Sequence, residues 1–191
     1  MGIDERFDST VVIFQVNEDW ICPVILMTPL RSPVWYSVRN GSKKGGKMST
    51  YIMTDIHGHY DDMREMFGKI GFSAGDRLIC AGDYIDRGSQ SYEMLQWMEH
   101  PGENVILVRG NHDEEFACYA DLMTMISQKA GLKMDSVEDT LTAYQALRQV
   151  SSYFDCYGTV GSLIQKKKVT LGQLVQWVAY IRKMPYFYEI M

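Results

Sequence analysis

The sequence of 191 residues predicts an α/β fold, a βαβαβ parallel sheet followed by helices. Three observations predict it. Short β-rich apolar runs alternate with amphipathic helical segments from residue 50 onward, the links between them are short, and helical patterns dominate after residue 130. Strands that alternate with helices through short links require a parallel sheet with right-handed crossovers.

The predicted sheet begins with TYIMTD at residues 50–55, a short β-rich apolar run. An amphipathic helix follows, because apolar side chains recur at i, i+3, i+4 and i+7 from Met63, and Gly71 is placed to end it. RLICAGD at residues 77–83 is the second predicted strand. SYEMLQWMEH at residues 91–100 is the second predicted helix, ended by the Pro-Gly pair that follows.

The third predicted strand is NVILVRG at residues 104–110, and a helix is predicted from about residue 113 to residue 129. Capping residues at Ser136 and at Thr170 each have a polar partner three residues later, and they predict the starts of two more helices. The β-rich segment YFYEI at residues 186–190 predicts a last strand.

The composition is that of a globular protein, with 46% hydrophobic and 23% charged residues. The net charge of −5 argues against nucleic acid as a partner bound through a basic face. The four cysteines form no C-x-x-C pair, so we expect no disulfide scaffold, and a cytoplasmic location fits. No apolar stretch approaches the roughly 20 residues that span a bilayer, so we expect no membrane partner. The oligomeric state is left open.

Residues 1–47 differ from the rest of the chain. They hold three of the five prolines and end in NGSKKGGK, and the periodic pattern begins only at Met48. One interpretation is a flexible extension ahead of the domain. The other is that Met48 is the true start, because Lys-Lys-Gly-Gly-Lys is what a purine-rich ribosome-binding site encodes when it is translated in frame. Sequencing the N-terminus of the native protein distinguishes the two.

Each predicted strand is followed at once by a loop with carboxylate, imidazole or amide side chains. The three loops read DIHG, GDYIDRG and GNHD, and they begin at Asp55, Gly82 and Gly110. Asp55 to Asp83 and Asp83 to Asn111 are each 28 residues, the length of one βα unit. The carboxyl ends of neighbouring parallel strands lie side by side and form a ligand crevice, so we expect the three loops to converge.

The side chains in these loops suit a site for metal and phosphate. Oxygen and imidazole ligands without thiolate favour Mn, Fe or Zn. Asp83, in the middle loop, is placed to bridge two metal ions, an arrangement that generates hydroxide near neutral pH. Arg87 offers a planar, permanently charged fork for phosphate oxygens. The alternative is that these side chains are ordinary turn and helix-cap residues. Three such loops at equal spacing argue against it.

DIHG, GDYIDRG and RGNHDE are similar, in order and in spacing, to the three N-terminal motifs of the PPP-type, calcineurin-like metallophosphoesterases. The resemblance covers roughly residues 50–116. It implies a metallophosphoesterase α/β sandwich that holds two divalent metal ions, Mn, Fe or Zn. The implied ligands are Asp55 and His57 for the first metal, Asp83 as the bridge, and Asn111 for the second.

The resemblance also implies the catalytic groups. His112 is the expected general acid for the leaving oxygen, oriented by Asp86, and Arg87 is the expected phosphate ligand. In this family a metal-bridging hydroxide attacks the phosphate ester directly. We therefore expect hydrolysis of phosphate monoesters like that of the serine/threonine protein phosphatases, with a phosphorylated protein or a small phosphoester as substrate. The alternative is a hydrolase like the diadenosine tetraphosphatases.

The chain departs from the family pattern after the third motif. The family completes its second metal site with two histidines from its C-terminal half, but the four histidines here stand at positions 57, 59, 100 and 112. The second metal would keep only Asp83 and Asn111, which is an incomplete site. We expect residues 48–191 to be a partial metallophosphoesterase domain whose C-terminal half is missing. A third interpretation is an inactive fragment that binds metal or phosphate without catalysis.

Four further polar residues have an ordinary structural interpretation. His59 is expected at the rim of the site. Arg109 either touches the substrate or forms a structural ion pair. Asp113 and Glu114 are expected to favour the dipole of the helix that they begin.

Overall fold

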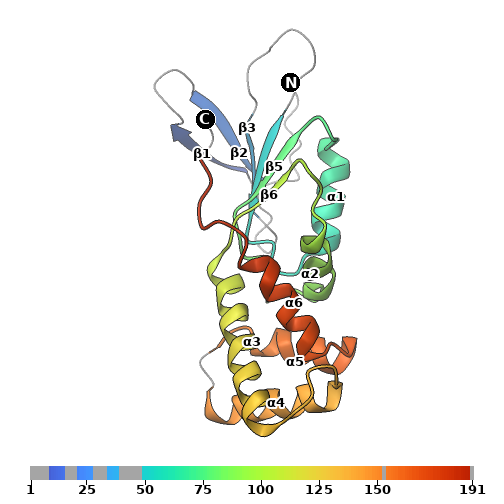
Figure 1. The fold of residues 1–191 in the computed structure, drawn as a ribbon. Helices are drawn as coiled ribbons and strands as arrows, with labels where there is room; N and C mark the ends of the chain where they lie inside the picture. Colours follow the sequence, from blue (N-terminus) through green and yellow to red (C-terminus); the bar gives the residue numbers. More distant parts are fainter. Residues whose placement is uncertain (1–8, 16–20, 28–33, 39–48, 152–153, 190–191) are drawn as a thin grey trace.

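The computed structural model has a four-stranded sheet with helices beside it and a helical region beyond its end (Figure 1). It describes residues 9–15, 21–27, 34–38, 49–151 and 154–189, the first three segments by their backbone alone. The strand order in the sheet is β3-β4-β5-β6. These strands are Val34–Val38, Thr50–Thr54, Arg77–Cys80 and Val105–Leu107. A separate antiparallel pair consists of β1 (Ser9–Gln15) and β2 (Ile21–Met27).

The predicted α/β class is confirmed, because β4, β5 and β6 run parallel to one another. The two crossovers are α1 (Tyr60–Ile70) and α2 (Ser91–Glu99). Gly71 ends α1 in the left-handed conformation, with φ 65°, as its place in the sequence predicts. Sequence analysis did not predict β3, which pairs antiparallel with β4. The division of the chain at Met48 stays a prediction.

The parallel strands are apolar on both faces. One row of register partners lies on the face that packs against the core, namely Met53, Cys80 and Leu107. The adjacent row points to the opposite face and consists of Ile52, Ile79 and Ile106. Because apolar residues occupy both faces, these strands read as near-continuous apolar runs and were recognisable in the sequence.

The described helices after the sheet are α3 (Asn111–Ala130), α4 (Val137–Val150), α5 (Tyr157–Lys167) and α6 (Leu171–Ile181). Both predicted caps are confirmed. The Ser136 hydroxyl accepts a hydrogen bond from the Asp139 N–H at 3.1 Å, and the Thr170 hydroxyl accepts one from the Gln173 N–H at 3.3 Å. Within the described part of the chain, no helix combines the length and the apolar composition needed to cross a lipid bilayer.

Sequence analysis missed α5. Its segment, YGTVGSLIQKK, holds two glycines, which lower helix propensity and hide the helical spacing of the apolar residues. In the structure the helix buries Val160, Leu163 and Ile164 in the core. Tertiary packing of this face therefore outweighs the weak local preference.

The strand predicted at residues 186–190 is wrong for its described part, because residues 186–189 form no strand. Just before this segment, the Arg109 N–H donates to the Pro185 carbonyl at 2.8 Å. No ladder of such bonds continues from Pro185 through the described residues. Since a strand needs that ladder, β-rich composition alone does not produce one, and Tyr186 and Phe187 remain exposed.

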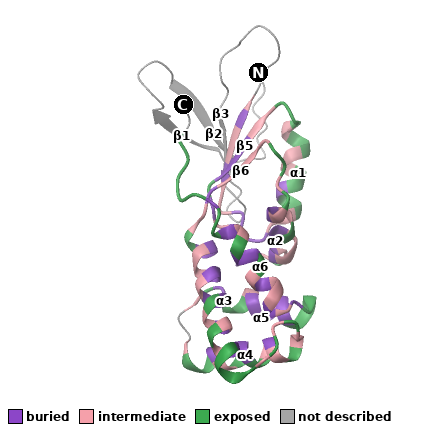
Figure 2. Cartoon of the chain, viewed as in Figure 1, coloured by how far each residue is buried: buried purple, intermediate pink, exposed green. Residues whose placement is uncertain are grey.

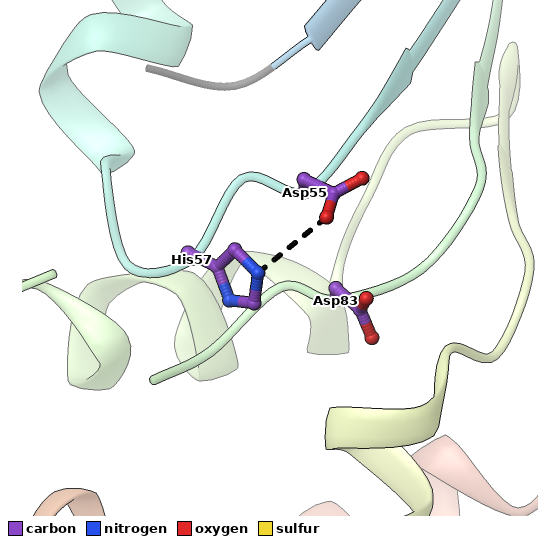
Figure 3. A group of neighbouring side chains, drawn as sticks. All are labelled: Asp55, His57 and Asp83. Carbon is purple, nitrogen blue, oxygen red and sulfur yellow. Dashed lines mark ion pairs between the residues drawn. The ribbon is translucent and has the colours of Figure 1, made fainter. Parts of the chain in front are cut away.

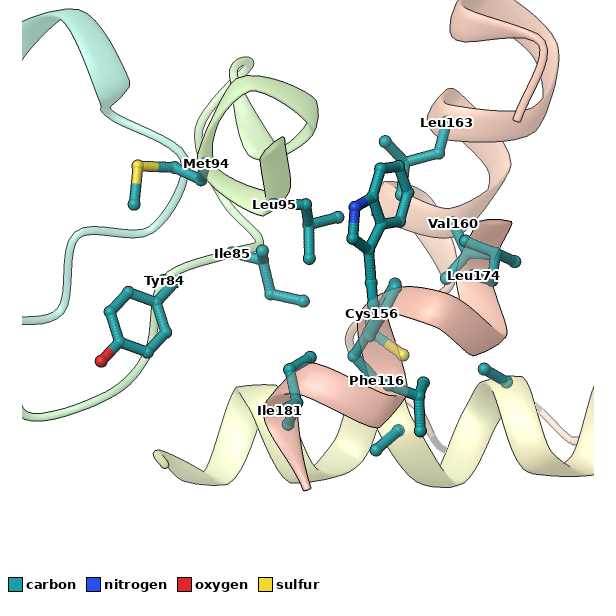
Figure 4. Close-up of a cluster of buried hydrophobic side chains, with 14 of the residues drawn as sticks. Tyr84, Ile85, Met94, Leu95, Phe116, Cys156, Val160, Leu163, Leu174 and Ile181 are labelled. Carbon is teal, nitrogen blue, oxygen red and sulfur yellow. The ribbon is translucent and has the colours of Figure 1, made fainter. Parts of the chain in front are cut away.

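One hydrophobic core joins the sheet to the helices. Figure 4 shows side chains from different helices meeting in it, including Leu95 of α2, Phe116 of α3, Val160 of α5 and Ile181 of α6. The buried residues lie on the inward sides of these helices (Figure 2). Trp177 of α6 is the largest fully buried side chain among the described residues. The core thus fixes the helical region at the end of the sheet where the predicted site lies.

The contact between α4 and α5 gives a test of the unpredicted helix. A Cβ added to Gly161 would lie 2.5 Å from the Tyr144 hydroxyl and 2.9 Å from its ring. We expect Gly161→Ala to lower the free energy of unfolding by about 1–3 kcal/mol, because overpacking displaces the buried ring.

The matched control is Gly158→Ala in the same helix, where an added Cβ meets no atom within 4 Å. It is expected to leave stability unchanged or to raise it by up to about 1 kcal/mol, because Ala is the better helix former. Urea denaturation measures both variants. Equal stabilities for the two would contradict the packing of α5 on Tyr144.

Candidate metal and phosphate site

The loops that follow β4 and β5 are bent sharply at the predicted site residues. Five non-glycine residues there adopt positive φ values: Asp55 (55°), His57 (45°), Asp83 (57°), Asp86 (71°) and Arg87 (62°). Side chains of L-residues disfavour this region, and residues held in it tend to cluster at functional sites. All five are residues that the sequence predicts for the site.

The first two loops are joined by backbone hydrogen bonds. The His57 N–H donates to the Asp83 carbonyl at 2.9 Å, and the Gly58 N–H donates to the Tyr84 carbonyl at 2.8 Å. In return, the Gly88 N–H donates to the His57 carbonyl at 2.8 Å. These bonds hold the strained conformations in place and set the two loops side by side.

The second and third loops touch backbone to backbone. A Cβ on Gly82 would lie 2.5 Å from the Gly110 Cα, and a Cβ on Gly110 would lie closer than 3.0 Å to the Asp83 backbone nitrogen. Gly82 also has φ 93°, which favours glycine. The glycines of these two motifs are therefore required by close approach between the loops.

Asp113 ties the same two loops together, a role that sequence analysis missed. Its side chain is fully buried and accepts hydrogen bonds from the backbone N–H groups of Gly110, Asp83 and Tyr84, at 2.8, 3.0 and 3.1 Å. Burial raises the pKa of Asp113 to about 6, although these donors act to lower it. Its place at the start of the predicted helix indicated a favourable interaction with the helix dipole, but not the bonds to the neighbouring loop.

Three predicted ligands come together in what we call the metal triad, Asp55, His57 and Asp83 (Figure 3). One ligand atom from each lies within 4.8 Å of the others. The His57 Nε2 is 3.6 Å from an Asp55 carboxylate oxygen. The triad follows two adjacent parallel strands, as the spacing of the motifs predicts.

His57 is held as a metal ligand would be. Its Nδ1 lies 2.8 Å from the Ile85 carbonyl oxygen, which can only accept, so Nδ1 carries the proton and Nε2 presents its lone pair to the triad. Nε2 is buried and has no hydrogen-bond partner in the structure. A buried polar atom without a partner is costly, and a divalent cation between Nε2 and the two carboxylates would satisfy it. The residues therefore fit a metal ion.

The start of α3 brings the third loop to the triad. The His112 backbone N–H donates to one carboxylate oxygen of Asp83 at 3.0 Å, which leaves the other oxygen for a ligand. Asn111, the predicted ligand of a second metal, is the first residue of α3 and is exposed. Its role stays a prediction.

His112 and Asp86 form a buried pair, which we call the acid dyad. The His112 Nδ1 lies 2.8 Å from an Asp86 carboxylate oxygen, and both side chains are less than a tenth exposed. The Ser91 hydroxyl accepts a hydrogen bond from the Asp86 backbone N–H at 3.2 Å, a contact that sequence analysis did not predict. The His112 ring meets the His57 ring edge to face at 4.8 Å, so the dyad adjoins the metal triad.

Arg87 completes the predicted set. It is exposed, and its guanidinium donates a hydrogen bond to the His112 Nε2 at 3.2 Å. Because Arg has no acceptor, Nε2 must be the acceptor and carries no proton in this arrangement. The guanidinium is thus held at the site by the imidazole and remains accessible to an anion.

The other polar residues have structural roles. Arg109 does not reach the site: it pairs with Glu114 at 2.6 Å and donates to the carbonyls of Arg182 and Met184. The arginine lowers the pKa of Glu114 through that hydrogen bond. Of the two interpretations of Arg109, the structural ion pair is therefore confirmed. His59 lies 3.0 Å from Asp62 at the start of α1.

The contact between the second and third loops can be tested by substitution. Gly110→Ala places a methyl group against the Asp83 backbone, which cannot move without breaking its bond to Asp113. We expect a loss of about 3 kcal/mol in the free energy of unfolding. The control is Gly68→Ala in α1, where a Cβ meets nothing within 4 Å; thermal melts in which both variants behave alike would contradict the close approach.

Metal binding by the triad is testable without any assay of activity. We expect Mn²⁺ or Zn²⁺ at a hundred times its Kd to raise the free energy of unfolding by about 2.7 kcal/mol. His57→Ala should abolish this stabilisation, because it removes the ligand with the unpartnered nitrogen. His59→Ala, which removes an imidazole outside the triad, should keep it. Stabilisation by metal that survives in His57→Ala would place the ion elsewhere.

Comparison with known proteins agrees with this geometry. A symmetrical bis(5'-nucleosyl)-tetraphosphatase from Buchnera aphidicola is 40% identical over 87 residues, 44% of this chain and 31% of the relative. The protein of that name from Escherichia coli O139:H28 is 33% identical over 96 residues, 50% of this chain and 31% of the relative. This chain thus spans less than a third of the length of these relatives.

Among solved structures, a serine/threonine protein phosphatase from Saccharomyces cerevisiae is a distant neighbour, with 19% identity and a TM-score of 0.40. The likeness covers 72% of this chain and 33% of that one, and no conclusion about function is drawn from it. The family follows from the sequence instead. The sequence model of the calcineurin-like phosphoesterases matches residues 48–180, which is more than half of the chain. The chain belongs to the calcineurin-like phosphoesterase family.

Proposed function

We propose that this chain carries the metal- and phosphate-binding part of a metal-dependent phosphoesterase that hydrolyses dinucleoside polyphosphates. The observation that supports the proposal most is the adjacency of the metal triad and the acid dyad, whose imidazole rings lie 4.8 Å apart on adjoining loops. A phosphate group bound between them would meet positive charge on one side and a proton donor on the other.

The metal triad would hold one metal ion, and Asp83 with Asn111 would provide part of a second site. A divalent ion there supplies charge to the phosphate oxygens and lowers the pKa of water. The chain's own residues orient these groups: the Ile85 carbonyl fixes the His57 ring, and the start of α3 fixes Asp83. The identity of the metal is left among Mn, Fe and Zn.

His112 would protonate the leaving oxygen from Nε2, the nitrogen that faces away from Asp86. In the free protein this nitrogen accepts from Arg87 and has no proton to give. A phosphate anion that draws Arg87 onto its own oxygens would free Nε2, because a charged acceptor binds guanidinium more strongly than a neutral imidazole does. Nε2 would then take up a proton from solvent, and this is the proton that it would give to the leaving oxygen. Arg87 would then couple the binding of substrate to the readiness of the acid.

The substrate class is taken from the names of the relatives. Both of the tetraphosphatases described above match at 33% identity or more, which favours the diadenosine tetraphosphatase-like alternative. The protein-phosphatase expectation has no support of this kind, since the yeast phosphatase is only a distant structural neighbour. Phosphate monoesters therefore become the second substrate to test.

An inactive, ligand-binding role is the competing function, and a specific observation favours it. The sequence has four histidines and none after position 112, so the second metal has few protein ligands here. A site with one metal would still bind phosphate through Arg87 without turning it over. The experiment must therefore separate binding from turnover.

The first experiment is hydrolysis of diadenosine tetraphosphate by the whole chain with Mn²⁺, followed by chromatography of the products. We expect symmetrical cleavage to two molecules of ADP. Loss of the general acid in His112→Asn should lower kcat by about 10²- to 10⁴-fold. His100→Asn, the same substitution at the exposed C-cap of α2, should retain full activity.

Each other outcome is informative. Turnover that is equal in His112→Asn and in the unsubstituted chain would remove the proposed acid. Faster release of phosphate from a phosphoserine peptide than cleavage of the dinucleotide would favour the protein-phosphatase function. Binding of metal and phosphate with no turnover of either substrate would assign the non-catalytic role to this chain.

A further inference from the structure

A small pocket lies beside the proposed phosphate site, and the proposed roles of the metal triad and the acid dyad do not use it. It encloses about 40 Å³ and opens to solvent between the loop that leads into α2 and the face of α5. Its lining includes Gly88, Ser89 and Tyr92 on one side and Thr159, Ser162 and Lys167 on the other. The unpredicted helix α5 therefore forms one wall.

The pocket adjoins the residue proposed to hold phosphate. Gly88, in its wall, follows Arg87 directly, which places the two Cα atoms about 3.8 Å apart. The Gly88 N–H is also bonded to the His57 carbonyl, so this wall is fixed to the metal triad. The pocket therefore lies one residue along the chain from the proposed phosphate ligand, on a loop that is fixed to the metal triad.

The polar groups of the pocket are mostly hydroxyls. Within the described part of the chain, the hydroxyls of Ser89, Thr159 and Ser162 make no hydrogen bond. Each can both donate and accept. Three such groups in one small pocket suit a ligand that also donates and accepts, such as the vicinal hydroxyls of a sugar.

Other ligand groups fit the pocket less well. A second phosphate would need a free cation, but the Lys167 ammonium is paired with the Glu93 carboxylate at 2.6 Å. A nucleobase would need a free aromatic face, but the Tyr92 ring has Lys167 over it at 4.9 Å and Trp177 against it at 5.9 Å. The lining therefore favours a neutral polyol.

We propose that this pocket binds the ribose of the nucleotide whose phosphate is held by Arg87. The proposal rests on the proposed function, since it makes that substrate a nucleotide rather than a phosphorylated side chain. Thr159 and Ser162 of α5 are then specificity residues, which favour nucleotides over simple phosphate esters. They touch the sugar and take no part in the chemical step.

The test uses binding, so it does not depend on turnover. Calorimetry on the whole chain with Mn²⁺ compares ADP, 2',3'-dideoxyadenosine diphosphate and inorganic phosphate. We expect ADP to bind about tenfold more tightly than the dideoxy compound, because two hydrogen bonds to the ribose are lost. In Thr159→Val and in Ser162→Ala this preference should fall to about two- or threefold, with phosphate affinity unchanged.

Thr142→Val is the matched control, the same substitution at an exposed position of α4, and it should keep the tenfold preference. Equal affinity for ADP and its dideoxy analogue, no binding of ADP, or a preference that survives both pocket variants would each overturn the proposal. If ADP binds more tightly than its dideoxy analogue but diadenosine tetraphosphate is not cleaved, the result supports the ribose pocket and contradicts the proposed hydrolysis. The two failures are thus distinguishable.

Discussion

The site depends on the contact between the loops that follow β5 and β6. Their backbones meet at Gly82 and Gly110, where neither position has room for a Cβ atom. The buried Asp113 carboxylate bridges the same loops by accepting three backbone N–H groups. Without this contact, Asp83 and the start of α3 would not be held together, and the acid dyad would lose its place beside the metal triad.

The predicted site residues occupy strained positions, and the surrounding backbone fixes them there. Five site residues hold positive φ values, which an isolated loop would relax. Hydrogen bonds between the first two loops and the rigid ends of parallel strands oppose that relaxation. The metal triad and the acid dyad thus share one rigid support, so the strain is consistent with preorganisation for a bound ion and an anion.

The helical region forms one wall of the proposed ribose pocket. The Glu115 carboxylate of α3 accepts a hydrogen bond from the backbone N–H of Cys156 at 2.9 Å. This bond fixes the start of α5 beside the core. Burial raises the pKa of the Cys156 thiol well above its ordinary value, so this cysteine is inert packing rather than a reactive group. Through this arrangement α5 brings the hydroxyls of Thr159 and Ser162 to the pocket lined by Gly88, where we propose that a ribose binds.

The parallel sheet, its crossover helices and the residues of the metal triad could all be predicted from the amino-acid sequence. The signals in the sequence are local: periodic apolar patterns, capping residues and three equally spaced motifs. Because the carboxyl ends of parallel strands lie side by side, the motifs that follow these strands are brought together. The other features depend on tertiary contacts. α5 forms because its neighbours bury it despite two glycines, residues 186–189 form no strand because they lack a ladder of hydrogen bonds, and Asp113 reaches a loop 30 residues away. Each of these depends on contacts between distant segments, which local sequence patterns do not encode.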